Sequence, residues 1–111
     1  MTTRIPEIDW AHELQDFTNR NAGRKTVLEE HDPSLGAQQE ERGWLLRGVA
    51  YDRRDHRVEI MLGELEGTDR HLTHTVSANS NIDLVTDTRG RDWALRIERP
   101  DGQTILRFDS D

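Results

Sequence analysis

The spacing of apolar residues changes part-way along the chain, and this change constrains the fold more than any other feature. Trp10, Leu14 and Phe17 lie at positions i, i+4 and i+7, which places all three on one stripe of an α-helix. Beyond Gly23 the apolar residues recur at every second position, as in strands with one buried face. The sequence therefore predicts an amphipathic helix over residues 7–22, followed by β structure.

The alternation is strictest in the last third of the chain. Trp93, Leu95 and Ile97 alternate there with small or charged residues. We expect these three side chains to face the core and Arg96 and Glu98 to face water, because a slip by one residue would bury two charges.

Turn residues divide the β-rich part, residues 24–109, into short strands. Pro100-Asp101-Gly102 combines a proline that presets φ with a glycine that tolerates positive φ, which favours a hairpin. A second hairpin is expected across residues 52–55. Strands are predicted at residues 24–30, 44–51, 56–62, 71–77, 81–86, 93–99 and 103–109. Loops are predicted at residues 31–36, 63–70 and 87–91, with residues 38–41 as a further loop or a wet edge.

These elements indicate a mainly β (α+β) fold. About seven strands follow one helix, and no helices alternate with them as parallel sheets require. We expect an antiparallel sheet that forms a small closed or half-open barrel or is strongly curled, with the helix over an open end or one face. With 111 residues, the chain is expected to form a single domain, residues 1–111.

Composition narrows the function classes. The net charge is −7, the acidic residues are spread along the chain, and there is no cysteine. This excludes disulfides and thiolate metal sites and disfavours nucleic acid as a partner. The N-terminus has no targeting pattern, and no apolar run is long enough to span a membrane. We expect a soluble cytoplasmic protein without a membrane partner or a cofactor.

Two histidines three positions apart, His71 and His74, form the clearest candidate for chemistry. On a helix such a pair can share a metal ion. In the predicted strand they point to opposite faces, and His74 shares the face of Leu72 and Val76. We therefore expect His74 to be the more buried of the two, held by a hydrogen bond in a structural role, with a ligand or acid/base role as the alternative.

Charged residues supply two further candidates. Asp52 and His56 could form a carboxylate–histidine pair for proton transfer, but they occupy a predicted hairpin turn, where charge commonly serves solubility. Arginines in residues 89–99 could bind phosphate or carboxylate groups, but acidic residues are interleaved with them, so ion pairing is the simpler interpretation.

Residues 58–63 (VEIMLG) and 71–76 (HLTHTV) follow a tryptophan-bearing amphipathic helix. In this order they resemble a family of small uncharacterised bacterial and archaeal proteins, a domain of unknown function. The resemblance covers nearly the whole chain, including residues 35–38 and 104–108. It implies no catalytic residues.

A second resemblance is to the Sm-like ring proteins, which bind RNA. It rests on residues 46–52, the apolar strand that follows them and the next strand, which carries histidines. Two extra strands, an acidic loop at residues 63–70 and the negative net charge depart from that pattern. The likeness is one of pattern alone.

Three functions from different classes remain. The leading hypothesis is a non-enzymatic binding or interaction module for a protein or small molecule, since nothing in the sequence demands catalysis. The alternatives are an Sm-like RNA-binding ring subunit and a small metal-dependent or acid/base enzyme that uses His74 or His71.

Overall fold

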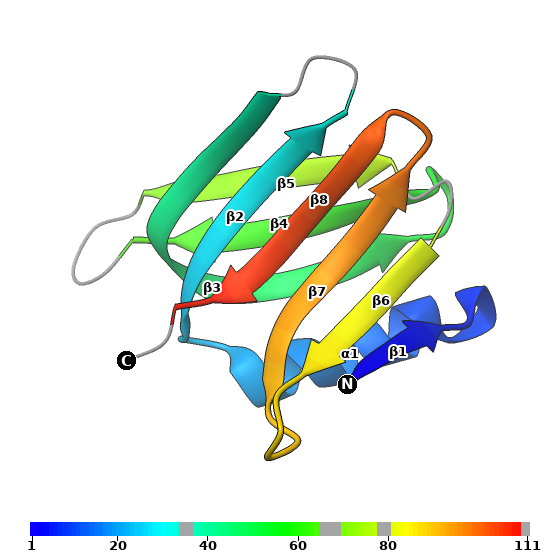
Figure 1. The fold of residues 1–111 in the computed structure, drawn as a ribbon, viewed down its shortest axis with the longest axis horizontal. Coiled ribbons are helices and arrows are strands. Elements are labelled where there is room, and N and C mark those ends of the chain that lie inside the picture. Colours follow the sequence, from blue (N-terminus) through cyan, green and yellow to red (C-terminus); the bar gives the residue numbers. More distant parts are fainter. Residues whose placement is uncertain (34–36, 65–69, 78–80, 110–111) are drawn as a thin grey trace.

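A computed structural model describes residues 1–33, 37–64, 70–77 and 81–109, and Figure 1 shows its fold. The predicted mainly β architecture is confirmed, with eight antiparallel strands among the described residues where about seven were expected. The strands are β1 (Thr2–Ile5), β2 (Lys25–Asp32), β3 (Ala37–Asp52), β4 (Arg57–Gly63), β5 (His71–Ser77), β6 (Asn81–Thr86), β7 (Asp92–Arg99) and β8 (Gly102–Phe108). The helices are the 3₁₀ turn η1 (Glu7–Asp9) and the α-helix α1 (Trp10–Asn21).

All eight strands belong to one sheet, in the order β1-β6-β7-β8-β2-β3-β4-β5. The long strand β3 pairs with β2 through its first half and with β4 through its second half. The sheet therefore turns over along β3, so that β4 and β5 lie behind β2, β8 and β7 and cross them at a steep angle (Figure 1). The end strands β1 and β5 are not paired with each other. The sheet is thus open, and the closed form of the expected barrel is not formed.

Both predicted hairpins are present. β7 and β8 pair across residues 100–101, and β3 and β4 pair across residues 53–56. The extra strand β1 pairs with β6. A strand of four residues is too short to show an alternation of apolar and polar side chains, so the sequence does not predict β1.

The amphipathic helix packs as predicted. Trp10, Leu14 and Phe17 are at most 2% exposed and lie in the hydrophobic core beneath the sheet. The expected helix over residues 7–22 divides into η1 and α1. Gly23 follows it with a φ of +89°, a conformation that commonly ends a helix and that glycine adopts without strain.

Thr18 links this helix to the second half of β3, on the side where β2 no longer pairs with β3. Its hydroxyl accepts a hydrogen bond from the Val49 amide at 2.9 Å and lies 3.1 Å from the Val49 carbonyl oxygen and 2.9 Å from that of Leu14. The helix therefore closes one end of the open sheet and satisfies backbone groups that lack a neighbouring strand there.

The prediction for Trp93 is wrong. Leu95 and Ile97 are fully buried as expected, but Trp93 is 47% exposed. The register between β6 and β7 shifts between Val85 and Thr86, so that Trp93 is the extra residue of a β-bulge. A bulge reverses the alternation, and Trp93 consequently faces solvent.

The same bulge turns Asp92 inward, where it is 8% exposed. Arg20 Nε and Asn21 Nδ2 each donate a hydrogen bond of 2.7 Å to its carboxylate. A buried charge needs such partners, so Asp92 links the start of β7 to the end of α1.

Of the two alternatives for residues 38–41, the loop is wrong and the edge is observed, because these residues belong to β3 and pair with β2 but not with β4. A polar segment can form a strand when the partner strand supplies its backbone hydrogen bonds. β2 likewise extends through Asp32 into the predicted loop 31–36. The rest of that loop at residues 34–36, and residues 65–69 of the next, lie outside the described residues.

No helix in the described part of the chain is long and apolar enough to cross a membrane.

Candidate functional site at the edge of β5

A polar cluster joins β5 to the strands that cross it. Glu30 on β2 lies at its centre, with Oε1 2.6 Å from His74 Nε2 on β5 and 2.5 Å from Thr104 Oγ1 on β8. The other carboxylate oxygen lies 2.9 Å from the Arg99 guanidinium at the end of β7. Arg99 also donates to Thr104 Oγ1 at 3.2 Å. Side chains from four strands are therefore linked through one carboxylate.

The surroundings of Glu30 favour its charged form. Partial burial acts to raise the pKa of its carboxyl, but hydrogen bonds from Thr104 and His74, together with the charge of Arg99, outweigh burial and hold the pKa below the ordinary 4.5. Glu30 is consequently an ionised anchor for β5 at neutral pH.

The histidines of β5 lie as the alternation predicts. His71 is exposed, whereas the side chain of His74 is 31% exposed and contacts Glu30. The two face opposite sides of β5, paired with Gly63 and Ile60, an arrangement that does not bring them to one metal ion. No group of three potential metal ligands in the described residues includes either histidine.

The outer edge of β5 is the second element of the site. β5 is the last strand of the sheet. Just beyond β4 and β5, the Glu64 amide donates a hydrogen bond of 3.2 Å to the carbonyl oxygen of Arg70, the residue directly opposite. Hydrogen-bonded and non-bonded pairs alternate in an antiparallel ladder, and no bulge interrupts β4 and β5. Leu72, His74 and Val76 therefore bond to β4. The backbone groups that point outward belong to His71, Thr73, Thr75 and Ser77.

The pairing of β4 with β3, on the other side of β4 from β5, supports this assignment of outward-facing groups. Ile60 pairs with both Val49 and His74, but the backbone of Val49 bonds to Thr18 instead of β4. The backbone of Ile60 must therefore point toward His74. This is the same alternation that the bond between Glu64 and Arg70 predicts.

A shallow pocket of about 380 Å³ adjoins the end of this edge. Thr75, Val76 and Ser77 line one side, and the turn formed by Arg99, Pro100 and Asp101 lines the other. The charged side chains of Arg99 and Asp101 therefore lie beside the last outward-facing backbone groups of β5.

The proposed pair of Asp52 and His56 is not assembled. Asp52 Oδ1 accepts hydrogen bonds from the amides of Arg54 and Asp55 and so stabilises the turn of the hairpin. His56 has a positive φ of 50°, and its Nδ1 lies 3.0 Å from the hydroxyl of Tyr51. The hydrogen bonds of both residues thus lie within the β3–β4 hairpin.

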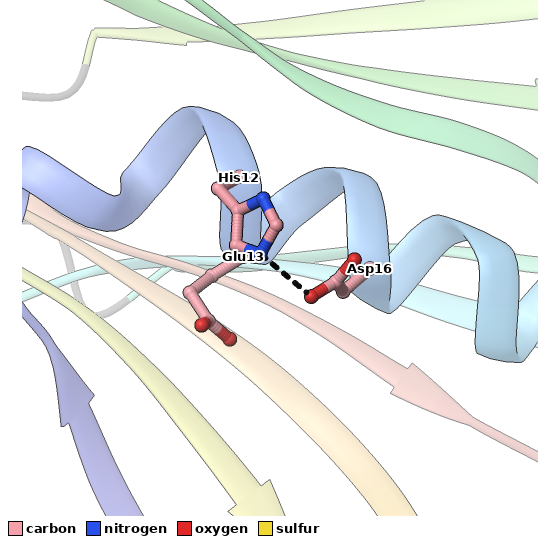
Figure 2. Close-up of side chains that lie close together, drawn as sticks. All are labelled: His12, Glu13 and Asp16. Carbon is pink, nitrogen blue, oxygen red and sulfur yellow. Dashed lines mark ion pairs between the residues drawn. The ribbon is translucent and has the colours of Figure 1, made fainter.

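A further group was not anticipated from the sequence. His12, Glu13 and Asp16 on α1 place potential metal-ligating atoms within 4.8 Å of one another. Figure 2 shows His12 and Asp16 pointing toward each other, with Nε2 and Oδ2 3.2 Å apart. The His12 side chain is 77% exposed. We interpret this group as a surface ion pair between residues four apart on a helix.

Comparison with known proteins identifies the family. A model described as "Family of unknown function (DUF5335)" matches residues 1–110. The chain belongs to the DUF5335 family. The resemblance to a family of small proteins of unknown function is thereby confirmed. No curated protein and no solved structure matches the chain.

Membership of the DUF5335 family assigns no site residues, so the site rests on geometry alone. The likeness to Sm-like rings gains no support from these comparisons. In this DUF5335 chain, moreover, a strand precedes the helix, and eight strands form one open sheet.

Sequence reasoning singled out His74 but missed its partner Glu30 and the residue that Glu30 bonds in turn, Thr104. Glu30 and Thr104 lie 44 and 74 positions from the residues they bond, and no local pattern marks them. Arg99 was recognised only as one of several arginines expected to form ion pairs, which it does with Glu30 and Asp101.

Proposed function

We propose that this protein is a non-enzymatic interaction module that binds its partner by adding a strand to the outer edge of β5. The observation that carries the proposal is the row of outward-facing backbone groups on a regular strand at the end of the sheet. An extended peptide binds such an edge through main-chain hydrogen bonds, and alternate side chains provide specificity.

The composition of β5 supports this proposal. Edge strands are ordinarily protected against pairing by charged residues, proline, bulges or short length. β5 spans seven residues with the sequence HLTHTVS, which contains no Asp, Glu, Lys, Arg or Pro. Its pairing with β4 shows no register shift. The other end strand, β1, has only four residues and carries Arg4, so the two end strands differ in how well they are protected against pairing.

The polar cluster supports the proposal in a second way. His74 is tied to Glu30, and Glu30 is tied to Thr104 and Arg99. These bonds fix the middle of β5 against the facing strands, whereas end strands are prone to fray. A strand that is already fixed loses little conformational entropy when a partner pairs with it.

The test is a titration with a probe peptide, followed by the amide signals of the ¹⁵N-labelled chain. The probe is a soluble peptide of alternating threonine and valine, and the control is the same peptide with N-methyl groups on alternate residues. Binding should shift the amides of Thr73 and Thr75 most, and the N-methylated control should have no effect. In a sample dilute enough for the chain to be monomeric, shifts confined to other strands, or none at β5, would contradict the proposal.

A pair of variants checks that the backbone is responsible. Thr73→Pro removes one outward-facing amide without breaking a bond to β4, as edge strands permit. Thr73→Ala removes the same side chain but keeps the amide. The proline variant should lose most of the affinity for the probe, and the alanine variant should retain it.

A further inference from the structure

The sequence of β5 is nearly symmetric about His74. Thr73 and Thr75 flank it, Leu72 and Val76 come next, and small polar or imidazole side chains end the strand at His71 and Ser77. Two antiparallel strands run in opposite directions, so in two copies of a strand with this symmetry each side chain lies opposite one of the same kind. Leu72 would then lie opposite Val76, and Thr73 opposite Thr75.

The backbone geometry permits the same register. Pairing about His74 places Thr73 opposite Thr75 and His71 opposite Ser77, and all four have outward-facing backbone groups. Each of these pairs exchanges two hydrogen bonds in an antiparallel ladder. A two-fold axis at His74 therefore uses every outward-facing group of β5.

We infer that the partner strand is β5 of a second copy of this chain, paired antiparallel about a two-fold axis at His74. This inference rests on the proposed function of β5 as a binding edge. The interface is isologous, as in most symmetric dimers. It joins two eight-stranded sheets into one continuous sheet.

The side chains of β5 favour a second copy of β5 as the partner strand. Threonine pairs and pairs of apolar side chains across strands stabilise a sheet. Leu72 is only partly buried in the single chain, and a second copy places Val76 beside it. Each chain carries a net charge of −7, which opposes association, but none of that charge lies on β5. The two copies therefore meet along an uncharged strand.

The first experiment measures mass by analytical ultracentrifugation from micromolar to millimolar concentration at physiological salt. We expect the mass to rise with concentration from 12.9 kDa toward twice that value. Added salt should promote association, because it screens the repulsion between like-charged copies. Thr73→Pro should stay monomeric and Thr73→Ala should dimerise. Dimerisation of the proline variant to the same extent would overturn the inference.

Two double variants test the register. Thr73→Glu combined with Thr75→Lys places opposite charges across the two-fold axis, so dimerisation should persist and become weaker in high salt. Thr73→Lys combined with Thr75→Lys places like charges together and should reduce association at least tenfold. In a register centred on residue 73 or 75, the Glu/Lys variant would instead face like charges and dissociate. Thr75 lies opposite Glu59 within the chain, so lysine is tolerated there in both variants.

The outcomes separate this inference from the proposed function. A chain that stays monomeric at millimolar concentration but binds the threonine–valine probe overturns the second copy as partner and leaves the binding edge intact. A monomeric chain that does not bind the probe overturns both.

Discussion

Replacing Glu30 by glutamine removes the charge at the centre of the contact between β5 and the facing strands. The carboxylate has three partners, His74, Thr104 and Arg99. Hydrogen bonds to a charged group contribute roughly 1.5–3 kcal/mol each. The Glu30 side chain is 22% exposed, and glutamine retains one acceptor oxygen, so water and the amide recover part of the loss. We expect unfolding free energy at neutral pH to fall by about 2–3 kcal/mol.

The pKa of Glu30 predicts how the stability difference between wild type and Glu30→Gln changes with pH. The folded-state pKa of Glu30 lies below its ordinary 4.5, so its ionisation stabilises the fold fully above that pH. The stabilisation is lost as the pH falls through the folded-state pKa, because the unfolded chain takes up the proton first. Glutamine does not titrate. The difference between wild type and Glu30→Gln should therefore shrink as the pH falls below 4.5.

Urea unfolding followed by tryptophan fluorescence measures this difference at each pH. Glu41→Gln, at an exposed position on β3, is the matched control and should change stability by less than about 0.5 kcal/mol. A Glu30→Gln variant as stable as the control at neutral pH, or a difference that stays constant on acidification, would refute the role given to this carboxylate.

Three further substitutions test the fold by thermal and urea unfolding. Leu14→Ala, at a fully buried position, should cost about 2–4 kcal/mol, and a cost below 1 kcal/mol would contradict the packing of α1. Thr18→Val leaves the backbone groups of Val49 without their partner and should cost about 1–3 kcal/mol, whereas Thr18→Ser should cost less. Gly102→Ala should destabilise the β7–β8 hairpin, because a Cβ there would collide with the carbonyl oxygen of His31; unchanged stability would show that the turn relaxes freely.

Local patterns predicted most of the fold. The change of period after Gly23 located the helix and the β-rich part, and the Pro100-Asp101-Gly102 turn located the β7–β8 hairpin. Both signals depend on neighbouring residues and on backbone preferences that act within a few positions. The sequence could not predict that the sheet turns over along β3, because pairing between distant strands decides it.

Trp93 shows where a local pattern fails. Its alternation with Leu95 and Ile97 indicated a buried side chain, but a bulge between β6 and β7 reverses its direction. At the bulge, Arg20 and Asn21 donate hydrogen bonds to the inward-facing carboxylate of Asp92. Those partners lie about 70 positions away, so the alternation around Trp93 could not reveal them.

The site was predictable only in part. The face of His74 followed from the alternation of β5, but its partner Glu30 did not. The position of β5 at the end of the sheet depends on the order of all eight strands. An interaction edge of this kind has no residue motif, because its hydrogen-bonding groups belong to the backbone.

Amide hydrogen exchange along β5 in a dilute solution of the chain tests the central claim most directly. If the outer edge of β5 is open, the outward-facing amides of Thr73 and Thr75 exchange rapidly, while those of His74 and Val76, bonded to β4, are protected. Equal protection of all four amides in a sample that ultracentrifugation shows to be monomeric would mean that other residues of the chain cover the edge, and it would contradict the assignment of β5 as a binding edge.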